Sequence, residues 1–163
     1  MTLAIEFNIE DEAWSNAAPW YREVALRAAG TAIAATGLTP QNVEISALLC
    51  GDERIADLNS AFRGKPTPTN VLSWPAHEAT PENAPTLAPD GFLGDIALAR
   101  ETVETEAKAQ HLTVENHFAH LFAHGVLHLL GYDHETDADA EVMEGLESQA
   151  MAKMGIKDPY AKP

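Results

Sequence analysis

The sequence has little cysteine, little basic charge and no long apolar run. Its only cysteine is Cys50, which excludes a disulfide framework and a cysteine-based zinc ribbon. Lysine and arginine number 10 against 25 acidic residues, and the net charge of −15 disfavours non-specific binding to nucleic acid or anionic membranes. The N-terminus lacks the basic and apolar regions of a signal peptide, and no stretch approaches the roughly 18 apolar residues of a membrane span. We expect a soluble cytoplasmic protein with no membrane partner, in which any anionic substrate meets a local basic patch.

The chain length and the first half of the sequence predict one domain that begins with a βαβ unit. A chain of 163 residues suits a single domain over residues 1–163. Apolar residues alternate over residues 3–9, which predicts a strand. Pro19 fits the first turn of a helix with Leu26 on its apolar face. Residues 43–50 are apolar enough for a strand buried on both faces, and this order favours a right-handed crossover.

The second half of the chain predicts two further strands and several helices. Ile55, Leu58 and Phe62 share one face of a short helix, and Pro75 limits the run before it to an edge strand. The helix over residues 114–130 is apolar on nearly every side, which is typical of a buried central helix. The expected elements are a helix capped by Asp52, an edge strand over residues 71–74, a surface loop over residues 76–90, a strand over residues 91–99, and helices over residues 101–110, 114–130 and 137–154.

Three histidines on and after this central helix are spaced for one metal ion. His124 and His128 are four residues apart, so their rings project from one helix face. A third ligand eight residues along a straight helix would lie about 12 Å away, whereas zinc binds nitrogen at about 2.0–2.1 Å. Gly131 permits the turn that ends helices, and His134 can then close the site. Three protein ligands leave a position open for water, as in catalytic zinc sites.

The surrounding residues limit the chemistry of this site. The histidine spacing resembles that of metzincin zinc proteases, and three imidazoles favour one zinc ion, although iron, nickel and copper also accept them. His117 and His120 lie on the same stripe, but a pair built from His120 and His124 has no third ligand behind a glycine. We therefore assign His117 and His120 to structure or to the cleft wall. Zinc proteases carry glutamate as general base after the first histidine. Here Gly125 stands in that place, which disfavours peptide hydrolysis.

Three blocks of sequence resemble the YbeY family of bacterial metal-dependent endoribonucleases. In the order and spacing of the family they are LNSAFR and PTNVLSWP within residues 58–75, LGDI at residues 93–96, and HGVLHLLGYDH at residues 124–134. The resemblance covers about residues 3–155, and Asn70 and Trp74 stand where the family usually has Asp and Phe. It implies an α+β fold with a small, mostly parallel mixed sheet and a short antiparallel edge strand. Helices pack this sheet, and the histidine-bearing helix is central in a metzincin-like core.

The resemblance also implies an activity and a substrate-binding residue. The implied function is single-strand-specific, zinc-dependent cleavage of RNA in 16S ribosomal RNA 3′-end maturation and ribosome quality control. The implied partners are this RNA and the small ribosomal subunit with its proteins. Arg63 matches the family's substrate-binding arginine, and with Arg54 and Lys65 it forms the best phosphate-facing patch in the sequence. Arg63 also ends a helix and would favour the helix dipole, so a structural role stays open.

We expect zinc on the three histidines to lower the pKa of a bound water. This water or a substrate 2′-hydroxyl attacks a phosphodiester, while Arg63 stabilises the developing charge. Asp95 and Asp133 are candidates for the acid–base group or for orienting a histidine ligand. Two alternatives stay open: a zinc metallopeptidase of metzincin-like geometry, and a zinc-stabilised ribosome-assembly factor that binds without cleaving.

Overall fold

A computed structural model describes residues 1–83 and 91–161 of the chain. Its four strands form one sheet in the order β1-β2-β4-β3. β1, β2 and β4 run parallel, and β3 pairs antiparallel with β4 at the edge. This confirms the expected mixed sheet and its short edge strand; of the expected surface loop, residues 84–90 lie outside the described part. The strands are β1 (Thr2–Ile9), β2 (Asn42–Cys50), β3 (Val71–Pro75) and β4 (Phe92–Ala99).

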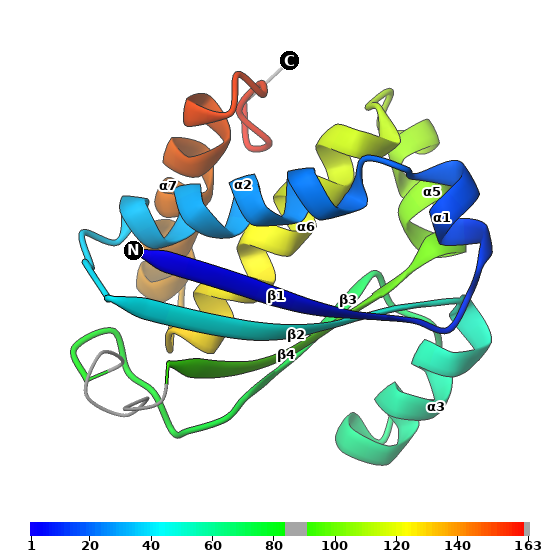
Figure 1. The fold of residues 1–163 in the computed structure, drawn as a ribbon, viewed down its shortest axis with the longest axis horizontal. Helices are drawn as coiled ribbons and strands as arrows, with labels where there is room; N and C mark the ends of the chain where they lie inside the picture. Colours follow the sequence, from blue (N-terminus) through cyan, green and yellow to red (C-terminus); the bar gives the residue numbers. More distant parts are fainter. Residues whose placement is uncertain (84–90, 162–163) are drawn as a thin grey trace.

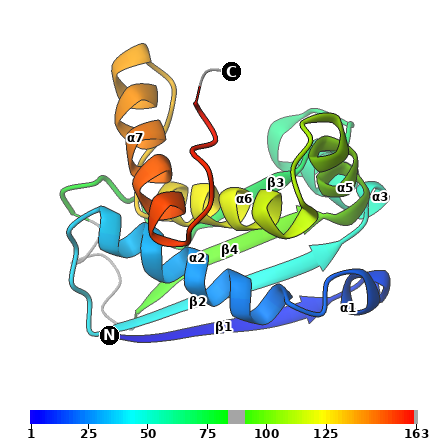
Figure 2. The same cartoon turned by 90° about the horizontal axis from the view of Figure 1, so that it is seen from above.

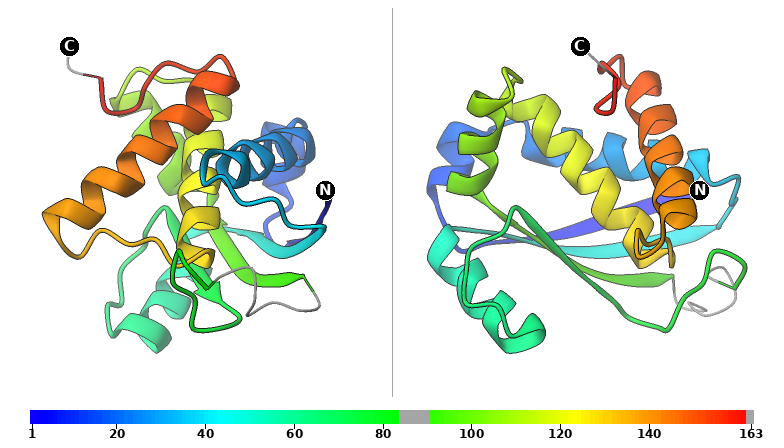
Figure 3. Two further views of the ribbon diagram at one scale, coloured as in Figure 1. Left: turned by 90° about the vertical axis from the view of Figure 1, so that its left-hand side faces the viewer. Right: turned by 180° about the vertical axis from the view of Figure 1, so that it is seen from behind.

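The helices divide between the two faces of the sheet. α2, α6 and α7 lie on one face and α3 lies on the other (Figures 1 and 3). Seen from above, α2 runs beside α6, and the C-terminal segment after α7 folds back beside α7 (Figure 2). Within the described residues no helix has the length and apolar character that crossing a membrane requires. The helices are α1 (Ala13–Ala17), α2 (Tyr21–Ala35), α3 (Asp52–Arg63), α5 (Arg100–Ala109), α6 (Val114–Leu129) and α7 (Asp137–Lys153).

α6 is the central helix of the fold, as expected from its apolar character. It contacts α2, α5 and α7 as well as β3 and β4. Phe118 and Phe122 of α6 are fully buried and stack on each other, and Trp14 meets Phe118 edge-on. Each such aromatic side chain removes about 150–250 Å² from water. The backbone that carries the histidines is therefore held by packing on several sides.

Three expectations about burial are wrong, and each has a packing reason. β2 is not buried on both faces, because α3 covers only part of the second face and leaves Glu44 exposed. Leu26 is 39% exposed because α2 packs against its neighbours through a stripe of alanines, and Leu26 lies outside this stripe. Phe62 is 63% exposed because it lies in the last turn of α3, beyond Ile55 and Asn59, which are the buried residues of this helix.

Candidate metal centre

A tight turn after α6 carries the chain back toward the histidine face of the helix. Gly131 adopts a φ of 95°, and the Tyr132 N–H donates to the Leu127 carbonyl at 3.1 Å, a bond that closes helix C-termini. A β-carbon on Gly131 would lie 2.5 Å from the carbonyl oxygen of Ala79, so a side chain there requires the neighbouring loop to move. The turn expected at Gly131 is confirmed.

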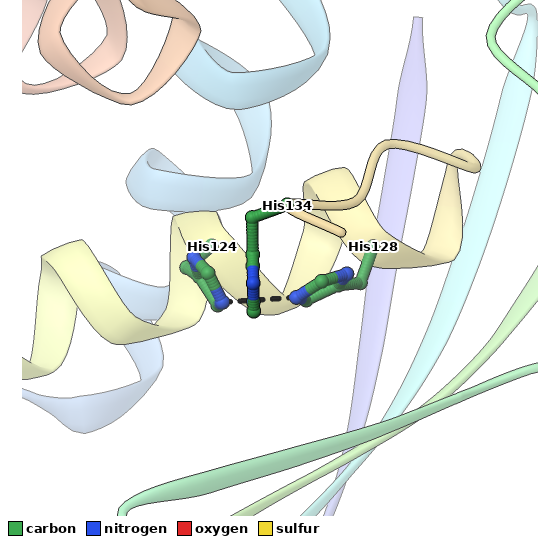
Figure 4. A group of neighbouring side chains, drawn as sticks. All are labelled: His124, His128 and His134. Atoms are coloured by element: carbon green, nitrogen blue, oxygen red, sulfur yellow. Dashed lines mark hydrogen bonds between the residues drawn. The ribbon is translucent and has the colours of Figure 1, made fainter. Parts of the chain in front are cut away.

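Three histidines converge beside this turn (Figure 4). His124 and His128 project from one face of α6, and His134 reaches toward them from the following loop. One ring nitrogen of each lies within 4.8 Å of the other two. The Nε2 atoms of His124 and His128 are 2.9 Å apart. The structure therefore brings together the three side chains predicted as metal ligands.

Hydrogen bonds assign the ring protons of the two helical histidines. A neutral imidazole carries one N–H; His124 Nδ1 donates to Glu147 Oε1 at 3.2 Å, and His128 Nδ1 donates to the Tyr132 carbonyl at 2.9 Å. Both Nε2 atoms then present lone pairs to each other, and these repel unless a cation lies against both. Burial, reinforced by His124, lowers the pKa of His128 to about 4, so its ring is neutral at neutral pH. This donor set fits a metal ion such as zinc.

The histidines line a cavity of about 480 Å³ beside β3. Arg63, the last residue of α3, and Asp133, in the turn after α6, line the same cavity. Arg63 is exposed and makes no ion pair or hydrogen bond with any described residue. Asp133 is half-buried, and its Oδ1 accepts a hydrogen bond from the Glu135 N–H at 3.3 Å. Tertiary packing thus places a free guanidinium and a carboxylate beside the histidines.

Comparison with known proteins places these features in one family. The family described as endoribonuclease YbeY matches residues 8–155. The chain belongs to the YbeY endoribonuclease family. Curated relatives with this name include those of Ruegeria pomeroyi (45% identical, covering 97% of this chain and 98% of the relative), Dinoroseobacter shibae (47%, 98% and 91%) and Azorhizobium caulinodans (48%, 99% and 98%).

A solved structure supports the fold of this YbeY chain. The solution structure of TM1509 from Thermotoga maritima is similar with a TM-score of 0.53 and 23% sequence identity, over 97% of this chain and 99% of that one. At this identity the likeness concerns the fold alone. It agrees with the expected α+β class and the mostly parallel mixed sheet.

Asp95, the other acid–base candidate, lies apart from the three converging histidines. In β4, Ile96 faces α6 at Gly125, and because side chains alternate along a strand, Asp95 faces the opposite side of the sheet. There it lines a separate cavity with Arg54, whose guanidinium pairs with Glu10 at 3.0 Å. Burial raises the pKa of Asp95. The structure thus separates Asp95, and the Arg54 part of the expected basic patch, from the histidine cavity.

Packing explains the glycine that this chain carries where zinc proteases have glutamate. A β-carbon on Gly125 would lie 3.1 Å from Cδ1 and 3.2 Å from Cγ2 of Ile96. That separation is tighter than ordinary van der Waals contact, so a side chain at this position requires the Ile96 side chain to shift by a few tenths of an ångström. The close approach of helix and sheet therefore disfavours a side chain, and with it a glutamate base, at position 125.

Asn70 belongs to a partly buried polar cluster that the sequence did not reveal. Its Nδ2 donates to Glu106 Oε1 at 3.0 Å, and His117 Nε2 lies 2.8 Å from the same oxygen. Aspartate, which the family usually has at this position, supplies no such donor unless protonated. The amide at position 70 is thus matched to Glu106. His117 is 4% exposed and takes part in this cluster rather than in the histidine triad.

Glu147 is a second buried polar residue that the sequence did not reveal. Burial by itself would raise the carboxyl pKa, but hydrogen bonds from His120 and His124 outweigh it and hold the pKa of Glu147 at about 2. Glu147 lies four residues from both Met143 and Met151, which are buried in the same helix. A carboxylate on this apolar stripe of the helix indicates a buried charge, and a buried charge requires hydrogen-bond partners. This pattern could have identified Glu147 from the sequence.

Proposed function

We propose that this protein is a zinc-dependent endoribonuclease that cuts single-stranded RNA in the cytoplasm. On this proposal it acts in 16S ribosomal RNA 3′-end maturation and ribosome quality control, in contact with the small ribosomal subunit and its proteins. The observation that carries the proposal is the shared cavity, in which three converging imidazoles, an unpaired arginine and a carboxylate lie together. Family relatives named as endoribonucleases support the choice of substrate.

Each group in the cavity has a role in phosphodiester cleavage. His124, His128 and His134 would hold one zinc ion, which when bound acts as a Lewis acid and lowers the pKa of water. Arg63 binds the phosphate through its planar guanidinium and stabilises the charge that develops on the non-bridging oxygens. Asp133 exchanges a proton with the attacking or the leaving oxygen. We assign this role to Asp133 rather than Asp95, because Asp95 faces the other side of the sheet.

The overall charge restricts how RNA reaches the site. A net charge of −15 repels a polyanion at long range, and affinity for RNA rises with the number of phosphates that Lys and Arg neutralise. Arg63 is the one cation among the residues that line the described histidine cavity. We therefore propose that RNA contact is local at Arg63 and that ribosomal proteins or RNA structure supply the remaining affinity.

Two other functions predict different results in the same assay. A zinc peptidase needs a base where Gly125 stands, and a β-carbon there would already crowd the side chain of Ile96. A ribosome-assembly factor would bind RNA without turnover. The test incubates zinc-loaded protein with a single-stranded 16S 3′-precursor oligonucleotide, its duplex form and casein.

We expect cleavage of the single strand alone, and loss of that cleavage in His128→Ala. Casein hydrolysis would establish the peptidase. Binding of the precursor without cleavage would establish the assembly factor.

A further inference from the structure

One buried carboxylate joins α7 to the histidine stripe of α6. Glu147 is 1% exposed, and its Oε1 accepts three hydrogen bonds, from His120 Nε2 at 2.6 Å, from the Tyr160 hydroxyl at 2.9 Å and from His124 Nδ1 at 3.2 Å. A buried charge requires several donors to replace its hydration. The three donors come from α6 and from the segment after α7, so Glu147 is the point where these parts of the chain meet.

The bond from His124 decides which ring nitrogen is available to a metal ion. A neutral imidazole that donates through Nδ1 keeps its lone pair on Nε2, and Nε2 is the atom that faces His128. Of the other triad members, His128 is oriented by the Tyr132 carbonyl, and His134 has no such partner among the described residues. Glu147 is thus the side chain that fixes ring orientation within the described triad.

We propose that Glu147 is a positioning residue for His124, and that Tyr160 of the C-terminal segment holds Glu147 in place. This proposal rests on the metal role assigned to the three histidines. A carboxylate behind a ligating histidine fixes the tautomer and ring orientation and raises the basicity of the ligand. By this arrangement Glu147 and Tyr160, which are not themselves ligands, would influence the affinity of the three histidines for the metal ion.

The C-terminal segment is fastened so that Tyr160 reaches Glu147. Asp158 Oδ1 accepts hydrogen bonds from Ser148 Oγ at 2.7 Å and from the Tyr160 N–H at 2.9 Å. The ring of Tyr160 meets that of His120 edge-on, with centroids 5.6 Å apart. Burial, followed by the charge of Glu147, raises the pKa of Tyr160, so the hydroxyl remains a donor at neutral pH. The segment therefore supplies, through Tyr160, the third hydrogen-bond donor to Glu147.

The experiment measures zinc affinity and the His124 tautomer in the full chain. Zinc dissociation constants come from competition with a chelator, and the tautomer from long-range ¹H–¹⁵N NMR of metal-free protein. We expect Glu147→Gln to weaken zinc binding by about 10- to 100-fold and to convert His124 from the Nδ1–H form to a mixture. The matched control is Glu141→Gln, which removes the same charge from an exposed site on α7 and should change neither quantity.

Tyr160→Phe keeps the ring against His120 and removes only the hydroxyl. We expect it to weaken zinc binding less than Glu147→Gln does, and to add nothing in the double variant, because it acts through Glu147. It also keeps the proposal testable if Glu147→Gln does not fold. Wild-type zinc affinity and an unchanged tautomer in the variants would overturn the positioning role. If His128→Ala also kept wild-type zinc affinity, the metal site itself would be wrong.

Discussion

Removing the guanidinium of Arg63 should separate catalysis from stability. Arg63 is exposed and makes no ion pair within the described residues, so its contribution to folding is limited to the helix dipole at the end of α3, about 0.3–1 kcal/mol. For a chain of this length, about 1 kcal/mol corresponds to roughly 2–4 °C in melting temperature. Loss of a contact to the transition-state charge instead costs about 10²–10³ in rate.

The assay compares Arg63→Ala with a control on the same helix. Arg54→Ala removes the same charge from α3, but Arg54 lines the separate cavity and pairs with the exposed Glu10. Arg54 and Arg63 are nine positions apart on the helix, or about 13 Å along its axis, which exceeds the Debye length of roughly 8 Å at physiological salt. We therefore expect Arg54→Ala to cut RNA at close to the wild-type rate and to melt within about 1 kcal/mol of wild type, as expected for an exposed pair.

Arg63→Lys should recover little activity, because an ammonium does not reproduce the planar fork that binds phosphate oxygens. Cleavage rate, zinc content and melting temperature are measured on one preparation of each variant. A variant of Arg63 that melts earlier but cuts RNA at the wild-type rate would show that this residue serves the scaffold and does not contact the transition state.

Two further predictions concern packing and reactivity. Gly125→Ala should lower the free energy of unfolding by about 1–3 kcal/mol, because its β-carbon meets Ile96 at 3.1 Å. Gly30→Ala, which has open space around it in α2, should instead raise the free energy of unfolding by about 0.5–1 kcal/mol. Equal effects of the two substitutions in denaturant titrations would show that the contact with Ile96 does not limit position 125. Burial, followed by the charge of Glu10, raises the pKa of the Cys50 thiol to about 12. A disulfide reagent at pH 8 should therefore label Cys50 only after the protein unfolds. Rapid labelling of the native protein would show that this thiol is accessible.

The sequence was sufficient for the features that depend on local spacing. His124 and His128 share a face because helical geometry fixes positions four residues apart, and Gly131 was recognisable as the turn that returns His134 toward them. The edge strand followed from Pro75, which donates no ladder hydrogen bond. These predictions needed no knowledge of which elements pack together.

The sequence was insufficient where two elements must be placed relative to each other. Asp95 lies in β4, and the sequence does not show which face of this strand meets α6, because most positions of the strand are apolar and buried. Which of the basic residues near α3 reaches the histidines depends on the orientation of that helix, and the structure selects Arg63 rather than Arg54. Glu147 joins α6 only through the path of α7. Tertiary packing, rather than residue type, decides all three.

Titration of metal-free protein with zinc, followed by the initial rate of single-stranded RNA cleavage, tests whether the three histidines hold a metal ion that the reaction requires. We expect no cleavage by the metal-free protein and a rate that rises linearly until one zinc ion per chain is bound. We also expect that His128→Ala binds no zinc at these concentrations and stays inactive, because removal of one ligand breaks the three-histidine site. Full cleavage by wild-type protein without metal, or zinc-dependent cleavage that is unchanged in His128→Ala, would contradict this role of the metal site.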